Sequence, residues 1–425
     1  MNIPNATYQR NMPLLCLGFL LPLFLYFARP VNGQISYHDF LNNKDKLGIP
    51  FELKGHLIIV HILLEEKLPL NFILDTGSPF SVLFEKTYAD ILRIKYSDTI
   101  RLAGADQTRA LRGHIARRIK IGLSPGHTAV RDIIILSQDY FKLKNYIGYN
   151  IHGILGMDFF KALLVEINFR RQRVVFYRDS TAIHISRKYI QIPIATHNGK
   201  PYLRLPLKVD ADSNSLVEAN LLLDTGAGLN MLLINGSSPT IQLPKNHIRG
   251  FIGTGLGGNV EGYLSRIEGY ELGGVTYHRT LAYFQSIDSN VVRLDTSFVR
   301  HGIIGNKLLE NYSVIIDVHH NKLFLKPYHT KPITFNWDKS GLLVYAVGAD
   351  FNHFIIGDVL EHSPAAKAGI LPGDQIVRIG WWPASWFSLN RITKMLSGKE
   401  NSKIRLTINR NGTIIKKQFR LKKLI

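Results

Sequence analysis

The chain has 425 residues, of which 45% are hydrophobic, a mean hydropathy of +0.01 and a formal net charge of +20. This composition is enough for two or three folded domains and excludes a low-complexity chain. Because the basic residues are spread along the chain with no recognition motif beside them, the charge indicates solvated basic faces with nonspecific attraction to anionic lipid or acidic polymers. It does not indicate specific binding of nucleic acid.

The N-terminal segment predicts export. Residues 12–28 read MPLLCLGFLLPLFLYFA, an uncharged apolar run, and small residues precede a possible cleavage site at Gln34. Residues 1–33 are therefore predicted to be a secretory signal peptide. An uncleaved N-terminal membrane anchor is the competing interpretation, because the run is close to the lower limit for a membrane span.

The only cysteine, Cys16, lies inside this segment. Cleavage would leave a mature chain with neither disulfides nor thiol catalysis. A cysteine-free exported protein of this size fits a bacterial periplasm or cell envelope better than a disulfide-stapled secreted enzyme.

The triplet Asp-Thr-Gly occurs twice, and each copy ends an apolar run. The first is FILDTGS, with Asp75, and the second is LLLDTGA, with Asp224. An isolated aspartate before Thr-Gly is ordinarily a turn former or a helix N-cap. The two copies carry more information than either one alone, because they occupy matching places of a longer repeat.

The repeat has a constant offset of 224 − 75 = 149 residues. The same offset carries HGILG at 152–156 onto HGIIG at 301–305, and LVEINFRRQRVVF from Leu164 onto SVIIDVHHNKLFL from Ser313. Each of these last segments reads as two short strands around a polar turn. The sequence therefore predicts two homologous halves, each bearing one aspartate.

A pair of carboxylates suits the hydrolysis of an amide bond. One group acts as a general base toward water, and the other protonates the carbonyl oxygen and then the leaving nitrogen. Two carboxylates about 3 Å apart cannot both ionise, so they share one proton and titrate as a unit. Neither half supplies the pair alone, so we expect Asp75 and Asp224 to meet between the halves.

The neighbouring residues are predicted to support the two carboxylates. Thr76 and Thr225 can donate hydroxyl hydrogen bonds to backbone across a pseudo-twofold axis, while the turns rely on Gly77 and Gly226. Gly156 and Gly305 permit close backbone approach beneath the turns.

Both halves resemble the aspartic peptidase family of the retropepsin type, fused in tandem as in pepsin-like enzymes. The resemblance covers roughly residues 55–327 and rests on D-T-G-[SA] plus the later apolar-apolar-Gly element in each copy. It implies that Asp75 and Asp224 are a catalytic dyad with a water molecule between them as nucleophile. It also implies that Ser78 can hydrogen-bond the outer carboxylate oxygen of its lobe, whereas Ala227 cannot.

The family resemblance further implies a β-hairpin flap in each half. The second half offers FIGTGLGGNVEG at 251–262, and the first offers LAGADQTRALRG at 102–113, with fewer glycines and more charge. The expected flap glycines are Gly104, Gly253, Gly255, Gly257 and Gly258.

No metal or cofactor is expected. His319 and His320 fall in the polar turn of a predicted hairpin, and the sequence has no HExxH motif and no Cys/His cluster. His152 and His301 precede the two apolar-apolar-Gly elements, where a shared packing or hydrogen-bonding role is favoured over catalysis.

The C-terminal part is predicted to be a separate domain. It contains a helical stretch with Ile392, Met395 and Leu396 and two strands joined at Asn411-Gly412. From about Phe335 it resembles a PDZ domain of bacterial envelope proteases, on the motif SPAAKAGILPGD from Ser363. The resemblance implies peptide capture by β-augmentation. The expected groove is lined by Gly341, Leu342, Leu343, Val344 and Ile392.

The sequence thus predicts a mainly β, single-chain monomer of four parts: 1–33, the signal peptide or anchor; 34–180 and 190–330, two retropepsin-like lobes; and 335–425, a PDZ domain. The predicted function is aspartic endopeptidase, with polypeptide substrates recognised through C-terminal or extended segments by the PDZ domain. The alternatives are a catalytically inactive peptide-binding scaffold of the envelope and a PDZ domain that only packs on the lobes.

Overall fold

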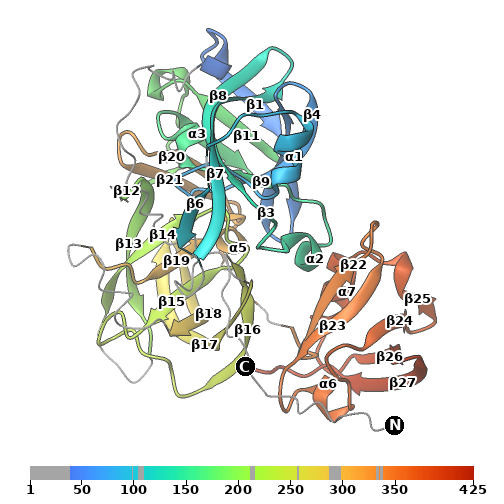
Figure 1. The fold of residues 1–425 in the computed structure, drawn as a ribbon. Coiled ribbons are helices and arrows are strands. Elements are labelled where there is room, and N and C mark those ends of the chain that lie inside the picture. The colour runs from blue at the N-terminus through green and yellow to red at the C-terminus, as the bar shows by residue number, and fades with distance from the viewer. Residues whose placement is uncertain are drawn as a thin grey trace.

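The computed structural model describes residues 39–97, 99–103, 110–210, 216–255, 258–286, 298–331, 335 and 338–425. The predicted signal peptide or anchor lies outside the described residues. The fold is mainly β, as predicted, and its strands form three sheets (Figure 1). The described strands of the two lobes and of the PDZ domain fall within the ranges 34–180, 190–330 and 335–425.

The first lobe is built on an eight-stranded sheet with the order β2-β3-β4-β9-β5-β8-β7-β6. Its strands are β2 (Glu52–Lys54), β3 (Leu57–Leu64), β4 (Leu68–Leu74), β5 (Val82–Leu83), β6 (Ile100–Ala103), β7 (Ala110–Ser124), β8 (His127–Leu136) and β9 (Gly153–Leu155). Three short helices accompany it: α1 (Lys86–Ile91), α2 (Leu143–Ile147) and α3 (Met157–Phe160). Strand β4 forms because FILDTG buries Phe72, Ile73 and Leu74 against the core before the glycine turn.

The second lobe repeats this plan within the largest sheet. Its strands are β13 (Lys200–Lys208), β14 (Val217–Asp224), β15 (Met231–Asn235), β16 (His247–Gly255), β17 (Gly258–Leu272), β18 (Val275–Ser286) and β19 (Gly302–Gly305), with helix α5 (Asn306–Leu309) after β19. In both lobes the strand that ends at the aspartate pairs in parallel with the apolar-apolar-Gly strand, as β4 with β9 and β14 with β19.

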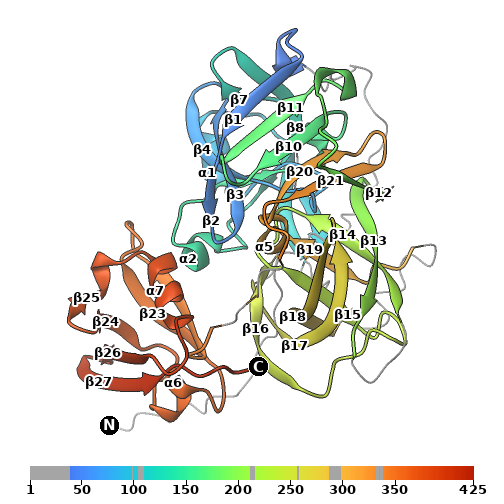
Figure 2. The ribbon, with the colours of Figure 1, turned by 180° about the vertical axis from the view of Figure 1, so that it is seen from behind.

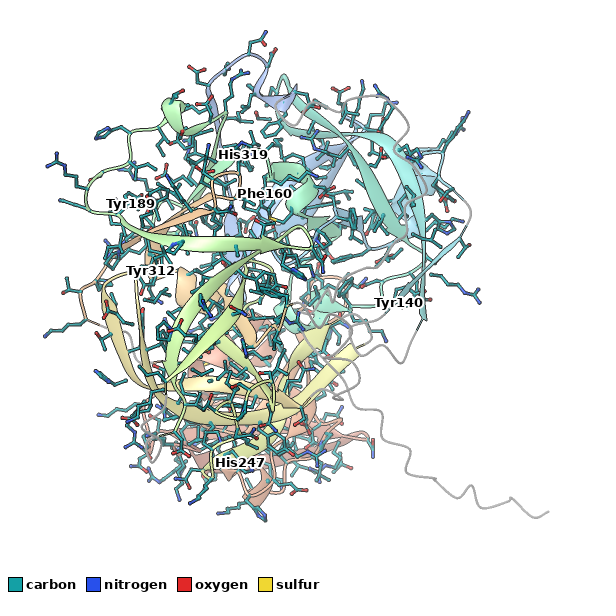
Figure 3. The ribbon with its side chains drawn as sticks, turned by 90° about the vertical axis from the view of Figure 1, so that its left-hand side faces the viewer. Tyr140, Phe160, Tyr189, His247, Tyr312 and His319 are labelled. Carbon is teal, nitrogen blue, oxygen red and sulfur yellow. The ribbon has the colours of Figure 1, made fainter. Side chains whose placement is uncertain are left out.

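The two lobes share strands. The repeated segments predicted as hairpins are hairpins, β10 (Leu164–Asn168) with β11 (Arg173–Tyr177) and β20 (Tyr312–Asp317) with β21 (Lys322–Pro327). Strand β10 pairs antiparallel with β20, and β1 (Lys46–Pro50) and β12 (Ile190–His197) extend the edges. In Figure 3, Tyr312 and His319 mark the start of β20 and the turn that follows it, and Phe160 lies in α3. One continuous sheet therefore joins the lobes.

The C-terminal domain has its own sheet and its own core. Its elements are β22 (Leu342–Val347), β23 (His353–Val359), α6 (Pro364–Lys367), β24 (Gln375–Ile379), β25 (Trp382–Pro383), α7 (Leu389–Leu396), β26 (Lys403–Arg410) and β27 (Thr413–Arg420). The predicted helix is α7, with Ile392 and Leu396 buried, and the predicted Asn411-Gly412 turn joins β26 to β27 with positive φ at both residues. Figures 1 and 2 show this domain beside both lobes, with α2 of the first lobe next to β22.

Candidate active site

The two aspartates lie at equivalent ends of buried strands. Asp75 directly follows β4, and its N–H donates to the carbonyl oxygen of Leu155 at 2.9 Å. Asp224 ends β14 opposite Gly305 of β19. Both carboxyls are almost fully buried, with 6% and 2% of Asp75 and Asp224 exposed. The strand ends therefore place both carboxyls in the protein interior.

The predicted hydrogen bonds across the pseudo-twofold axis are present. The hydroxyl of Thr76 donates to the carbonyl oxygen of Leu223 at 2.5 Å, and that of Thr225 donates to the carbonyl oxygen of Leu74 at 2.7 Å. Each hydroxyl oxygen also accepts from the backbone N–H of the other threonine at 3.0 Å. Four hydrogen bonds thus tie the two turns together.

The glycines of the triplets explain how closely the turns meet. A Cβ on Gly77 would lie 2.5 Å from the carboxyl carbon of Asp224, and a Cβ on Gly226 would overlap the carboxyl group of Asp75. These distances leave no room for any side chain. Each glycine therefore packs against the aspartate of the opposite lobe, which brings the two carboxyls face to face.

The two carboxyls receive different hydrogen bonds. The Oδ1 atom of Asp75 accepts from the N–H groups of Gly77 at 2.7 Å and Ser78 at 3.2 Å, whereas Oδ1 of Asp224 accepts from Gly226 at 2.9 Å. The prediction for the Ser78 hydroxyl is wrong, because it donates to the carbonyl oxygen of Phe80 at 2.6 Å within its own turn. Ser78 thus supports Asp75 through its backbone.

The carboxyl pair is electrostatically uneven. Burial raises the pKa of Asp75, an effect that the N–H of Gly77 opposes. Burial raises the pKa of Asp224 much further, because the neighbouring charge of Asp75 adds to it. The two carboxyls therefore form a coupled pair in which the protonated form is favoured more strongly at Asp224 than at Asp75.

The elements beneath the turns match the predictions. A Cβ on Gly156 would lie 2.4 Å from the carbonyl oxygen of Phe80, and one on Gly305 would lie 2.4 Å from that of Leu229, so both glycines allow close backbone approach. The ring of His152 accepts from the N–H of Asn71, and the ring of His301 accepts from that of Asn220, each at 2.9 Å.

Burial lowers the pKa of both His152 and His301. The neutral form of each ring is therefore favoured, as its acceptor role requires. The paired histidines thus have the shared hydrogen-bonding role that the sequence favoured.

Both predicted flap segments belong to hairpins. In the first lobe β6 pairs with β7 up to Ala103 and Ala110, and in the second β16 pairs with β17 up to Gly255 and Gly258, with an irregularity between Phe251 and Gly253. Gly104 and Gly257 lie outside the described residues. The role of these hairpins as flaps stays a prediction.

Sequence analysis missed a buried cation at this site. Lys200, 1% exposed, begins β13, which pairs with β14, the strand that carries Asp224. Arg300 also lies close to Asp224 and is half-buried. No motif marks either residue, and only the register of the second-lobe hairpin brings Lys200 to the aspartate.

The predicted PDZ groove lies between the edge strand β22 and helix α7. Gly341, with a φ of +80°, precedes β22, while Leu342 and Val344 point into the core with Ile392, and Leu343 is half-buried. The side chain of Asp338 already accepts from the N–H groups of Ser340, Gly341 and Leu342. An internal carboxylate therefore occupies the start of the loop that was expected to hold a peptide carboxylate.

Helix α2 of the first lobe covers part of this groove. The rings of Tyr146 and Tyr345 meet edge to face with centroids 4.5 Å apart. A Cβ on Gly148 would lie 3.1 Å from the Cβ of Leu389 and 3.5 Å from that of Ala346. The segment around α2 thus contacts both walls, β22 and α7.

Comparisons with known proteins agree with this division. A family model described as aspartyl protease matches residues 60–159, and one described as PDZ domain matches residues 355–410. The chain therefore contains an aspartyl protease domain and a C-terminal PDZ domain.

A probable CtpA-like serine protease of Staphylococcus saprophyticus is 37% identical over 91 residues, which is 20% of this chain and 18% of that protein. The carboxy-terminal processing protease CtpB of Bacillus subtilis is 34% identical over 77 residues, 18% of this chain and 16% of that protein. The chain thus matches less than a fifth of the length of either relative.

Among solved structures, Basic 7S globulin from soybean is similar at 8% identity and a TM-score of 0.41, over 67% of this chain and 96% of that one.

Within the described ranges, no group of three or more His, Cys, Asp or Glu side chains is arranged to hold a metal ion. In the same part of the chain, no helix is long and apolar enough to cross a membrane.

Proposed function

We propose that the chain is an aspartic endopeptidase whose catalytic dyad is Asp75 and Asp224. The observation that carries the proposal is the reciprocal packing of Gly77 on Asp224 and of Gly226 on Asp75, which leaves two buried carboxyls facing each other. The relative named as a serine protease matches only a small part of the chain, and its name does not weigh against this geometry.

In the proposed reaction, ionised Asp75 takes a proton from a water molecule. At the same time the oxygen of that water attacks the peptide carbonyl carbon. Asp224 donates its proton to the carbonyl oxygen, giving a tetrahedral diol. The C–N bond then breaks as Asp75 returns its proton to the nitrogen and a diol hydroxyl returns a proton to Asp224. The dyad ends in its starting charge state, with no cofactor consumed.

The test is proteolysis of a denatured protein substrate between pH 3 and pH 8 by the wild type and by Asp75→Asn and Asp224→Asn. General acid–base catalysis contributes about 10²- to 10⁴-fold, so we expect each variant to lose on that order of its activity. His319→Ala, in the exposed turn after β20, is the matched control. Full activity of either Asn variant would overturn the proposal, and binding without cleavage by the wild type would favour an inactive scaffold.

We further propose that the PDZ domain binds an extended polypeptide segment along β22. Because α2 lies across this groove and Asp338 occupies its N–H loop, the segment must displace α2 and does not depend on a free C-terminal carboxylate. Tyr146→Ala removes the ring contact with Tyr345, so this variant should capture more members of a displayed random-peptide library than the wild type. Equal capture by both proteins contradicts this role for α2.

The site of action is proposed to be the periplasm or envelope of a bacterium, reached through the signal peptide or anchor predicted in residues 1–33. Cell fractionation and N-terminal sequencing of the expressed protein test this, and a cytoplasmic protein that begins at Met1 would contradict it. We propose that the active form is a monomer, because both aspartates belong to one chain.

A further inference from the structure

The two lobes differ at one position directly beside the carboxyls. In the second lobe Tyr202 of β13 pairs with Leu222 of β14, so the same register places Lys200 opposite Asp224. In the first lobe Ile59 of β3 pairs with Ile73 of β4, which places Leu57 opposite Asp75. Residues directly opposite each other in an antiparallel pair lie on the same face of the sheet.

The turns before these strands give the same correspondence. Lys54 pairs with Leu57 across one two-residue turn, and His197 pairs with Lys200 across the other. The second turn also reaches the first lobe, since a Cβ on Gly199 would lie 3.9 Å from Pro79. Lys200 therefore lies where the second lobe meets the turn after β4 in the first lobe. Its equivalent in the first lobe is the apolar Leu57.

The charged and titratable groups that face Lys200 are few. Asp224 at the end of β14 and Asp75 after β4 both attract its ammonium group, and Arg300, just before β19, repels it. Tyr202 on β13 interacts with Arg300 and Asp224, and His197 on β12 packs on Tyr202. A buried ammonium group is costly unless an opposite charge compensates it, and the dyad with one shared proton supplies one negative charge.

We propose that Lys200 is the counter-charge of the dyad, a positioning residue of the second lobe that stabilises the singly ionised carboxyl pair. This inference rests on the proposed peptidase function. Lys200 takes no proton from the substrate and acts only through the two carboxyls. The first lobe has no equivalent, because Leu57 carries no charge.

The sign of the effect on pH dependence follows from the charges. A positive neighbour favours loss of the first proton from the dyad, so it moves the acidic limb of the activity profile to lower pH. Burial, with Arg300 adding to it, lowers the pKa of Lys200 itself to about 7. Lys200 therefore stabilises the singly ionised carboxyl pair at acidic pH, and this stabilisation is lost as the pH rises through about 7 and Lys200 becomes neutral.

The experiment compares kcat/KM against pH for the wild type, Lys200→Met and Lys200→Arg on one peptide substrate. An opposite charge at close range lowers a carboxyl pKa by about 1–3 units, so the acidic limb of Lys200→Met should move up by that amount. Lys200→Arg keeps the charge and should keep the wild-type limb. Leu57→Met is the matched control in the first lobe and should leave the limb unchanged.

An unmoved acidic limb in Lys200→Met overturns the inference while leaving the peptidase function intact. Absence of cleavage by the wild type overturns the peptidase function instead. In that case, carbon-13 NMR titration of the Asp carboxyls in the wild type and Lys200→Met reads the charge coupling directly. Equal titration midpoints in the two proteins then overturn the inference, and higher midpoints in Lys200→Met support it.

Discussion

In the first lobe, Asp75 accepts two backbone hydrogen bonds and faces the apolar Leu57. In the second, Asp224 accepts one and faces Lys200. By contrast, the hydrogen bonds of Thr76 and Thr225 across the axis are reciprocal. The duplicated halves therefore share the contacts that need both lobes, and they differ where each lobe acts on its own aspartate.

The largest effect is expected from the glycines that touch the opposite carboxyl. Gly77→Ala and Gly226→Ala would each push an aspartate away from its partner, and a displacement of about 1 Å costs on the order of 10²-fold in rate. Both variants should therefore lose at least that much kcat/KM, measured beside circular dichroism to verify folding. Near-normal activity in a folded variant of either kind would mean that the carboxyls do not need this contact.

The next largest effect is expected from substituting the reciprocal threonines, Thr76 and Thr225, and it should appear as a loss of stability. Thr76→Val leaves the N–H of Thr225 and the carbonyl oxygen of Leu223 without their partner, and Thr225→Val does the same in mirror image. Each unsatisfied buried group costs about 1–3 kcal/mol, so urea unfolding should show a loss of a few kcal/mol in each variant. Markedly unequal losses would break the symmetry of this contact.

Ser78→Ala makes the first lobe like the second at the residue after the triplet. Its hydroxyl donates to Phe80 and not to the carboxylate, so the pH profile should stay unchanged. Loss of one hydrogen bond should lower stability by about 1 kcal/mol, measured by urea unfolding. A shift of the acidic limb would show that the hydroxyl reaches Asp75 after all.

The smallest difference is expected between His152→Leu and His301→Leu. Each removes an acceptor for one backbone N–H, of Asn71 or Asn220, in the same geometry. We expect each loss of stability to be about 1–2 kcal/mol and the two losses to be equal within error. Loss of catalysis in only one folded variant would assign that histidine a role of its own.

Sequence patterns predicted the features that recur in both lobes at the 149-residue offset. They therefore predicted both aspartates, the cross-lobe threonines and the hairpins that join the lobes. Lys200 was not predicted because its equivalent, Leu57, lies 200 − 57 = 143 residues earlier, which departs from the 149-residue offset of the repeat. The connection between β3 and β4 is shorter than the one between β13 and β14. Only the pairing register of the strands therefore aligns Leu57 with Lys200, and the sequence does not show that register.

The PDZ domain shows a second limit of sequence analysis. The motif from Ser363 predicted the fold, since α6 and β24 follow from it. The motif did not predict that Asp338 folds back onto the N–H groups before β22, or that α2 lies across the groove. The α2 contact joins the first lobe to the PDZ domain, so it depends on how the two pack together, whereas the Asp338 contact is local to the loop before β22. The spacing Asp338-Lys339-Ser340 was the only local signal, as an Asx turn.

The pairing of β10 with β20 has a consequence for how the active site assembles. An active site shared between two separate chains exists only as often as the chains associate, so its activity per molecule falls on dilution. Here the halves are joined by the chain and by a continuous sheet, which makes their meeting intramolecular. The proposed peptidase should therefore keep the same activity per molecule at any concentration at which the chain stays folded.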